Sequence, residues 1–347
     1  MDSLFEDNDD GADLVMKLCH IPAFAAPWVG RFYDPAEVRL LALCDGQGEA
    51  IVGDRLVAAK VAADHVAAQA LIRRAVVRGV LSDTSTNGLQ PADFHIRFDY
   101  WALFEGWQDI PAEVRWQLNQ WELEAYIEEH RRSAADLKAG APRDAYQVIP
   151  EYVLLHEAQA LVQRVPHIYL WPCNCRSMLE GCKQPRLTCL RFDNTRGIGW
   201  EISKARAQII LLEASRKGLM HSAELGLTAE GLPIGAICNC CSDCCFPHRL
   251  ADREQAARFW PLSRYTARLD PQACNGCGRC ERRCPFGAIQ LKKSTDPDQP
   301  PKAALDSALC RGCGVCAVGC RQVAIEMVQQ RESVFEKWYQ PLPVSPF

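Results

Sequence analysis

The sequence predicts an α+β protein with several domains, and three observations support this fold class. Apolar residues recur at helical spacing in residues 31–140, which indicates a mainly helical domain. Residues 145–262 combine helix and strand patterns with grouped cysteines, which indicates an α/β middle domain. Residues 263–330 hold two similar blocks of short strands, each with a run of cysteines. An acidic segment (1–30) precedes these domains, and a tail rich in proline and aromatic residues (331–347) follows them.

The first helix of the N-terminal domain is expected to begin with a capping box. Asp34 is the expected N-cap, Pro35 takes the first helical position, and Glu37 lies three residues after the cap. A longer helix is expected within Asp54–Gly79, with Gly79 as its C′ residue. The expected buried face of that helix consists of Val66, Leu71, Ile72, Ala75 and Val76.

A strand at Val80–Ser82 after this helix gives the domain a winged-helix-like order of elements. A DNA-binding helix would gather basic residues on one face. Here the arginines near the end of the helix are balanced by acidic residues, and the formal net charge of the chain is −4. DNA is therefore not expected as a partner, and a protein-docking or interdomain role is expected for this domain.

The second half of the N-terminal domain, Phe94–His130, is unusually aromatic. Such side chains form either a buried core or the centre of a subunit interface. We expect a core. The charged stretch Arg131–Arg143 is the expected domain boundary.

Two cysteine runs in the C-terminal domain share the spacing C-x2-C-x2-C-x3-C. The runs are Cys274, Cys277, Cys280 and Cys284, and Cys310, Cys313, Cys316 and Cys320. Three thiols spaced by two residues lie on one tight loop and can bind three corners of a [4Fe–4S] cubane. The alternative is a pair of structural zinc sites with four thiolates each.

On these runs, and on Pro285 after the first, the region Ser263–Gln330 resembles a bacterial ferredoxin with two [4Fe–4S] clusters. The second run departs from the family pattern, because Arg321 stands in the proline position. The resemblance implies that the fourth cysteine of each run ligates the other cluster. The implied ligands are Cys274, Cys277, Cys280 and Cys320 for one cluster, and Cys310, Cys313, Cys316 and Cys284 for the other.

Short strands are expected around these runs, in two hairpins. Their expected positions are Tyr265–Asp270, Ala288–Lys292, Ala303–Asp306 and Val323–Val328. The insertion Ser294–Pro301 between the runs is expected to be a surface loop.

The middle domain carries nine more cysteines in two fields. They are Cys173, Cys175, Cys182 and Cys189, followed by Cys238, Cys240, Cys241, Cys244 and Cys245. Helices are expected at Glu151–Arg164 and Ser203–Lys217, the second with Ser203 as N-cap and Gly218 as C′, and a strand at Ile168–Leu170. The chain between the two fields is long enough for them to face each other across one site.

Several metal centres are compatible with these nine thiols, and they stay open at this point. The first field alone has the four ligands of one cluster, which leaves the second field for another centre. Adjacent cysteines point in different directions, so one of each vicinal pair can bind while the other packs or bridges to a second centre. A non-cubane cluster with five thiolates is a further alternative. Structural zinc on four of the nine is another, and disulfides are not expected in a reducing compartment.

Two polar residues beside these cysteines are expected to have supporting roles. Arg176 is expected either to hydrogen-bond a cluster sulfur or to form a salt bridge. His248 is expected to be a surface residue or to support a ligand rather than to bind metal.

The whole chain resembles a family of uncharacterised iron–sulfur proteins. Its members have a winged-helix-like N-terminus, two middle cysteine blocks and a C-terminal two-cluster ferredoxin. The matching positions are Cys173, Cys175, Arg176, Cys182, Pro185, Cys189 and Cys238 through Cys241. The chain departs from the family at Ser242 and Asp243, where a glycine and a tighter cysteine run are expected. The resemblance implies electron transfer and supplies no substrate.

Composition and the remaining motifs limit the function. No apolar stretch approaches eighteen residues and the N-terminus is acidic, so we expect a cytoplasmic protein without a membrane span. Cys19 and Cys44 stand alone and are expected to be buried apolar residues. No dinucleotide or ATP-binding fingerprint is present.

We expect two [4Fe–4S] clusters, at least one further iron–sulfur cluster or zinc, and a redox protein or subunit as partner. The alternatives are a redox enzyme with a catalytic cluster in 173–245, its substrate unknown, and an iron–sulfur redox sensor.

Overall fold

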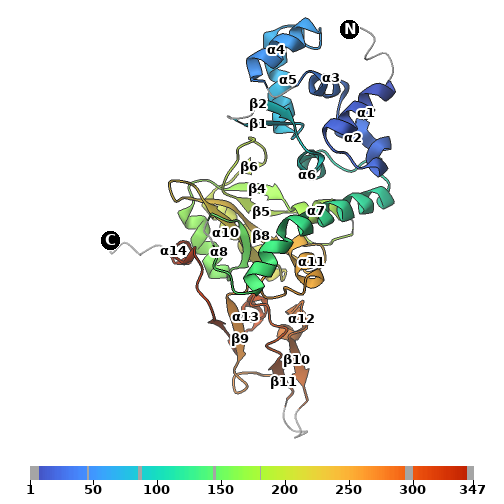
Figure 1. The fold of residues 1–347 in the computed structure, drawn as a ribbon. Coiled ribbons are helices and arrows are strands. Elements are labelled where there is room, and N and C mark those ends of the chain that lie inside the picture. The colour runs from blue at the N-terminus through green and yellow to red at the C-terminus, as the bar shows by residue number, and fades with distance from the viewer. Residues whose placement is uncertain are drawn as a thin grey trace. The chain divides into compact units, whose positions relative to one another are not determined.

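The structure is a computed structural model that describes residues 8–44, 47–84, 88–143, 146–179, 181–293 and 300–341. The chain divides into two compact units. The first contains the residues up to Glu122, with Ser177–Glu180 and Thr195–Ile198, and the second contains the rest. Both helices and strands are present, as the predicted α+β class requires (Figure 1). The domain boundaries inferred from the sequence stay predictions.

Parts of three expected segments lie outside the described residues. They are the first seven residues of the acidic segment, residues 294–299 of the predicted surface loop, and residues 342–347 of the tail. Of the helices in the described part of the chain, none combines the length and the apolarity needed to cross a bilayer.

The first unit is mainly helical and carries one β-hairpin. Its helices are α1 (Asn8–Leu18), a 3-10 helix (Ala23–Trp28), α2 (Val29–Phe32), α3 (Pro35–Leu43), α4 (Glu49–Ala58), α5 (His65–Val77) and α6 (Phe94–Phe104). Helix α7 (Ala112–Lys138) has residues in both units. Strand β1 (Leu81–Thr84) pairs antiparallel with β2 (Gly88–Pro91). The hairpin follows α5, whereas the winged-helix-like assignment stays a prediction.

The predicted helix caps of this unit are confirmed. The Asp34 carboxylate accepts hydrogen bonds from the backbone N–H groups of Ala36 and Glu37 at 2.9 and 3.0 Å. The Glu37 carboxylate in turn accepts from the Asp34 N–H at 3.0 Å, which completes the capping box. Gly79 follows the C-cap of α5 with φ +73°, the left-handed conformation that favours glycine at C′.

The expected buried face of α5 is wrong at one position. Val66 is 73% exposed, because the helix begins at His65 and Val66 lies in its first turn. The fully buried positions are Ala68, Ile72 and Ala75, which are spaced by four and three residues.

The aromatic segment contributes to the core of this unit. Phe32 contacts Phe94 edge to face at 4.9 Å between ring centroids, and Trp101 at 4.7 Å. These three side chains are buried, so they form core as expected. Trp116 is the exception, with 57% of its surface exposed.

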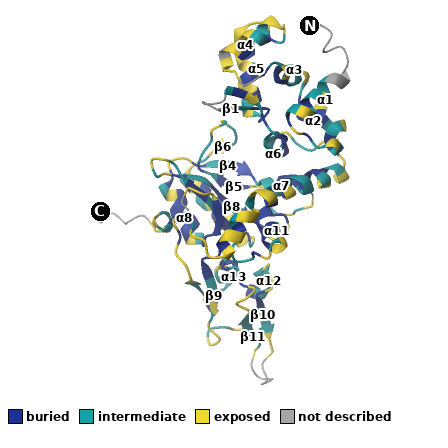
Figure 2. Cartoon of the chain, in the orientation of Figure 1, coloured by how far each residue is buried: buried dark blue, intermediate teal, exposed yellow. Residues whose placement is uncertain are grey.

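The second unit is built on an antiparallel sheet with the order β3-β7-β8-β5-β4-β6. The strands are β3 (Ile149–Tyr152), β4 (Tyr169–Pro172), β5 (Leu187–Arg191), β6 (Trp200–Glu201), β7 (Met220–Leu227) and β8 (Pro233–Cys240). Helices α8 (Leu155–Arg164) and α10 (Lys204–Arg216) pack on one face of this sheet. Their apolar core includes Leu190, Ala223 and Ile237, and the strands are largely buried (Figure 2).

The expected helix Glu151–Arg164 is wrong in its first turn. Glu151 lies in β3 and the helix begins at Leu155. The Glu151 carboxylate is buried and pairs with Arg143 at 2.6 Å, which a solvent-facing helix position would not allow. The helix is capped instead by Glu157, whose carboxylate accepts from the Leu154 N–H at 2.7 Å.

The other predicted elements of the middle region are present. The Ser203 hydroxyl accepts a hydrogen bond from the Arg206 N–H at the start of α10, and Gly218 has φ +83° beyond its end. Two shorter helices follow cysteine-bearing segments, α9 (Asn174–Met178) and α11 (Phe246–Arg253).

The C-terminal part contains the four predicted strands, but they do not form the two successive hairpins that were expected, because the first strand pairs with the last and the two inner strands pair with each other. Strand β9 (Tyr265–Leu269) pairs with β12 (Ile325–Gln329), and β10 (Ile289–Lys292) pairs with β11 (Lys302–Leu305). Each cysteine run leads into a one-turn helix, α12 (Arg279–Arg283) or α13 (Val315–Gly319).

The described part of the tail packs on the second unit. Helix α14 (Glu336–Tyr339) contacts α8, and Phe335 and Tyr339 are buried in the same core as the sheet. The apolar composition of the tail is explained by this packing.

Candidate metal centres

The eight cysteines of the two runs line two small cavities in the C-terminal part. One cavity is lined by Cys274, Cys277, Cys280 and Cys320. The other is lined by Cys284, Cys310, Cys313 and Cys316. Each cavity thus combines three cysteines of one run with the last cysteine of the other run. These are the two sets that the ferredoxin resemblance implies.

Glycines in both runs let the backbone approach closely. Gly312 has φ +71°, and a Cβ atom added to it would lie 2.2 Å from the carbonyl oxygen of Tyr265. Gly276 has φ +73°, and its added Cβ would lie 2.2 Å from the carbonyl oxygen of Pro301. A side chain at either position would collide with backbone, so the loops require glycine.

The thiols of each set interact with one another. Burial, reinforced by the nearby Cys284 and Cys310, raises the pKa of Cys313 to about 12. Burial also raises the pKa of Cys280, which the neighbouring Cys274 and Cys320 reinforce. Buried neutral thiols bind metal only after losing their protons, so metal binding at these sites would release protons.

The nine cysteines of the middle region divide into two groups. The six-thiol group consists of Cys173, Cys175, Cys189, Cys238, Cys240 and Cys245. The three-thiol group consists of Cys182, Cys241 and Cys244. Each group takes cysteines from both sequence fields, so the fields do face each other. The four cysteines of the first sequence field do not form one ligand set in the structure, because Cys182 lies in the three-thiol group and the other three lie in the six-thiol group.

The β-sheet assembles the six-thiol group. Cys238 and Cys240 alternate along β8 and therefore share one face of the sheet, opposite to the face covered by α8 and α10. Leu190 of β5 pairs with Ile237, which places Cys189 beside Cys238 on that same face. Cys173 directly follows β4, Cys175 lies in α9 and Cys245 is the N-cap of α11.

Hydrogen bonds between thiols connect the six members in one chain. The linked pairs are 173–175, 175–245, 245–240, 240–238 and 238–189. The hydrogen bond from Cys173 holds the pKa of Cys175 well below the ordinary thiol value. Hydrogen bonding and burial raise the pKa of Cys173 and Cys189.

A carboxylate beside the six-thiol group was missed by sequence reasoning. Glu224 of β7 pairs with Ala236 of β8, so it lies on the cysteine-bearing face. Burial raises its pKa to about 7, and its side chain hydrogen-bonds that of Cys238. The sequence pattern of β7 did not single out Glu224, because the strand also carries the polar residues His221 and Ser222.

The three-thiol group is more compact. The Sγ atom of Cys182 lies 4.0 Å from that of Cys241 and 3.8 Å from that of Cys244, and the Cys241 and Cys244 sulfurs are 2.8 Å apart. The Asp243 carboxylate is close enough that all four ligand atoms lie within 4.8 Å of one another. The hydrogen bond with Cys244 lowers the pKa of Cys241 to about 6. Asp243 was not among the ligands expected from the sequence.

The vicinal cysteines are divided between the groups. Cys240 and Cys245 belong to the six-thiol group, whereas Cys241 and Cys244 belong to the three-thiol group. This agrees with the expectation that adjacent cysteines point in different directions.

Arg176 and His248 support the loop that carries the three-thiol group. Arg176 is buried and donates to the carbonyl oxygens of Pro185 and Asn239, and its side chain also hydrogen-bonds Cys241. His248 is buried too, so of its two expected roles the surface position is wrong, and the support of a cysteine-bearing loop is the one that the contacts fit. Its Nδ1 lies 3.1 Å from the Cys241 carbonyl oxygen, and its Nε2 lies 2.8 Å from the Tyr152 hydroxyl.

The six-thiol group and one ferredoxin-type cavity meet in a single apolar cluster. Its members are Tyr152, Met220, Cys240, Cys245 and Val315, with Cys238, Phe286 and Cys313 packed against them. Tyr152 is fully buried there, and its pKa is raised mainly by burial and then by Cys313, Cys245 and Cys240. One tyrosine therefore lies among thiols of both centres.

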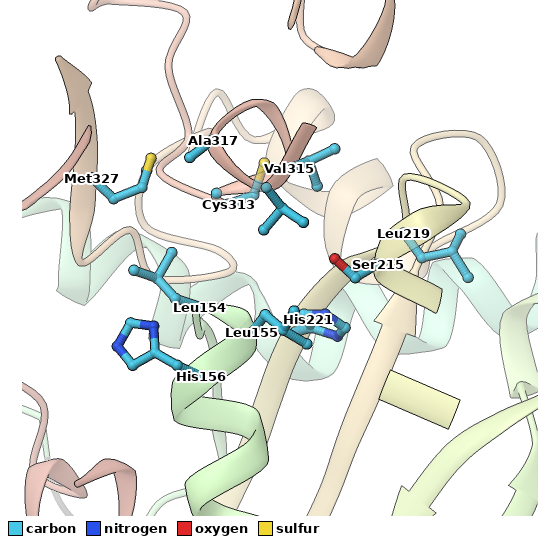
Figure 3. Close-up of a pocket in the computed structure, with 12 residues that line it drawn as sticks. Leu154, Leu155, His156, Ser215, Leu219, His221, Cys313, Val315, Ala317 and Met327 are labelled. Carbon is cyan, nitrogen blue, oxygen red and sulfur yellow. The ribbon is translucent and has the colours of Figure 1, made fainter. Parts of the chain in front are cut away.

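A pocket of about 260 Å³ lies beside Cys313 (Figure 3). Leu154 and Leu155 line it from the N-cap and first residue of α8, and Val315 and Ala317 line it from α13. Two histidines also border it. His156 is exposed, whereas His221 is 3% exposed.

The C-terminal part matches a known family. Residues 273–324 match the family described as the 4Fe-4S dicluster domain. Among curated proteins, none matches the chain significantly. The matched segment contains all eight cysteines of the two runs, so this part of the chain is an iron–sulfur module of the ferredoxin type.

Proposed function

We propose that the chain is an iron–sulfur electron-transfer protein with three centres in its second unit. The match to the 4Fe-4S dicluster domain supports iron–sulfur electron transfer. The proposed ligands are Cys274, Cys277, Cys280 and Cys320 for the first cluster, and Cys284, Cys310, Cys313 and Cys316 for the second. A [4Fe–4S] cluster supplies one-electron redox chemistry when bound. The chain supplies the thiolates, the surrounding backbone N–H groups and the exclusion of water.

The six-thiol group is the proposed third centre. Six mutually interacting thiols are too many for one mononuclear ion, which takes four ligands in a tetrahedral site. They also outnumber the ligands of one cubane, so a cluster with additional or bridging thiolates fits this group best. The partly enclosed Glu224 is available to hydrogen-bond a cluster sulfur or to take up the proton that accompanies reduction.

The apolar cluster around Tyr152 is the observation that carries this proposal. It packs Cys313 of the second cluster set in one contiguous layer with Cys238, Cys240 and Cys245 of the six-thiol group. Electron exchange between the two regions would cross this layer without passing through solvent. Without this packing, nothing would connect the second cluster set with the six-thiol group as a path for electrons.

The first cluster set marks the end at which a partner would dock. Cys277 is exposed, whereas Cys310 and Cys316 of the second set are buried. A redox protein or partner subunit would approach Cys277, and the second set would connect that end with the six-thiol group. A reducing, cytoplasmic location is part of this proposal, because all nineteen cysteines are free.

The test is iron analysis of anaerobically purified protein with EPR after dithionite reduction. The expected result is about twelve irons per chain and a third EPR signal besides those of two [4Fe–4S] clusters. Cys238→Ser should remove the third signal and its iron while the ferredoxin signals stay. Cys277→Ser should alter one ferredoxin signal and leave the third.

Two outcomes would contradict the proposal. Fewer than about eight irons in the wild-type protein would refute the two-cluster assignment. About eight irons, with no change in iron content in Cys238→Ser, would refute the third centre and leave a two-cluster carrier.

The pocket beside Cys313 favours a second candidate, a redox enzyme. It is large enough for a small molecule and lies between Cys313 and His221, so a bound molecule would lie next to the second cluster set. A filling variant, Ala317→Phe, separates the two functions. An electron carrier would still reduce an external acceptor protein, whereas an enzyme would lose turnover of its small substrate.

A further inference from the structure

The three-thiol group lies in a loop region that the electron-transfer proposal does not use. Cys182 comes from the segment after α9, and Cys241, Asp243 and Cys244 come from the turn between β8 and α11. Cys241 and Cys244 are buried, whereas Asp243 is exposed. The group therefore joins two loops and opens to solvent on its carboxylate side.

The spacing of the sulfur atoms fits a single tetrahedral ion. With zinc–sulfur bonds of about 2.3 Å, two thiolates of one tetrahedral site lie about 3.8 Å apart. The distances from the Cys182 sulfur to those of Cys241 and Cys244 are 4.0 and 3.8 Å. Only the 2.8 Å pair, Cys241 and Cys244, would have to separate by about an ångström on metal binding.

The same spacing argues against a cubane on these thiols. Each cysteine of a [4Fe–4S] cluster binds its own iron. The cysteine sulfurs of a cluster therefore lie farther apart than cysteine sulfurs that bind one shared ion. Three thiols in mutual contact also leave no room for bridging sulfides between them. Zinc also accepts a carboxylate oxygen as a ligand, which Asp243 can supply.

We propose that Cys182, Cys241, Cys244 and Asp243 bind one zinc ion, separate from the iron–sulfur centres. Three thiolates and one carboxylate give this site an excess of negative charge. Arg176, buried beside Cys241, offsets part of that charge. The ion ties the Cys182 loop to the turn that carries Cys240 and Cys245 on its flanks, so it holds two members of the six-thiol group in position.

The test is zinc and iron content of the full-length protein, purified anaerobically, for the wild type and three variants. Wild-type protein should contain a single equivalent of zinc. Cys182→Ser and Cys244→Ser should lose most of it, whereas Cys238→Ser, the matched control in the six-thiol group, should keep it. Protein in which cobalt(II) replaces the zinc should show the visible absorption of a tetrahedral thiolate site, and this absorption should be lost in the first two variants.

A variant at the exposed ligand keeps the test decisive if the cysteine variants fail to fold. Asp243 is on the surface, so Asp243→Ala should leave the fold intact and weaken cobalt(II) binding at least tenfold. Three results would overturn the proposal: zinc-free wild-type protein, loss of iron instead of zinc in Cys182→Ser, or a Cys241–Cys244 disulfide in protein purified without oxygen. None of these results depends on whether the six-thiol group holds iron, so the zinc site and the proposed function can be refuted independently.

Discussion

The Nδ1 atom of His221 lies 2.7 Å from the Oδ1 atom of Asn239, on the face of the sheet opposite to the six-thiol group. The Asn239 amide nitrogen donates to the Thr188 carbonyl oxygen, so its Oδ1 atom must be an acceptor for His221. His221 therefore carries its proton on Nδ1. Its Nε2 atom is buried and has no hydrogen-bond partner among the described residues.

This arrangement predicts that acid weakens the fold through His221. Burial lowers its pKa to about 4 from the ordinary 6.5. Between these values the unfolded chain binds a proton that the folded chain does not, so stability is complete above about pH 6.5 and falls toward pH 4. The wild-type free energy of unfolding should drop by about 2 kcal/mol more between pH 7 and pH 5 than that of His221→Gln.

The measurement is anaerobic denaturant unfolding at both pH values. His167→Gln is the control, because His167 is exposed and pairs only with Glu201 at the surface. An equal drop in wild type and His221→Gln would mean that His221 does not resist protonation in the folded state.

Gly312→Ala should disrupt the second ferredoxin-type set. The added methyl group would lie 2.2 Å from the Tyr265 carbonyl oxygen, and φ +71° is itself unfavourable for alanine. Gly287→Ala is the matched control, since Gly287 has φ +65° but nothing within 4 Å of an added Cβ. Gly312→Ala should lose about four irons per chain, whereas the control should keep its iron and lose only about 1 kcal/mol of stability. Equal iron in the two variants would show that the loop relaxes around the methyl group.

The pair Glu157 and Arg264 should stabilise the contact between α8 and the segment that leads into β9. Their atoms are 2.8 Å apart with both side chains buried, and the Tyr265 hydroxyl also donates to Glu157 at 2.7 Å. Glu157→Gln leaves a buried guanidinium without its main partner, which should cost about 3 kcal/mol of unfolding free energy. The exposed pair Arg268 and Glu326 provides the comparison.

Breaking that exposed pair with Arg268→Gln should cost less than about 1 kcal/mol, because water screens it. Denaturant unfolding of both variants measures the difference. A cost for Glu157→Gln as small as that of Arg268→Gln would mean that water or Glu336 replaces the lost partner.

The sequence predicted the helix caps and strands that are determined by residues close together in the chain. The capping box at Asp34, the caps Ser203 and Gly218, and the four strands around the cysteine runs follow from residue types at fixed short spacings. The sequence predicted helix at Glu151, where the structure has a strand. The buried Glu151 carboxylate is stabilised there by Arg143 and by the tail residues Ser333 and Tyr339, and helix periodicity does not report such contacts between separate segments.

The grouping of the middle cysteines was beyond such rules. Cys189 reaches Cys238 only through the register of β5 on β8, which sequence spacing does not encode. Cys182 likewise lies apart from the other cysteines of its sequence field. The turn after β8 brings Cys241 and Cys244 next to it, and sequence spacing does not encode this contact either. Glu224 was missed because only the pairing of β7 with β8 brings it to the thiols. Asp243 precedes Cys244 in the sequence, but only the folded turn brings its carboxylate close to Cys182 as well.

The vicinal pair Cys240 and Cys241 offers the most direct test of two separate centres. Cys240 interacts with Cys238 and Cys245, whereas Cys241 interacts with Cys182 and Cys244. Cys240→Ser should therefore lower the iron content and keep zinc, and Cys241→Ser should lower zinc and keep most of the iron. Both variants change one sulfur to oxygen at adjacent buried positions, so general damage to the fold would affect them alike. If both substitutions removed the same metal to the same extent, the nine thiols would form one shared centre, and the division into two groups would be wrong.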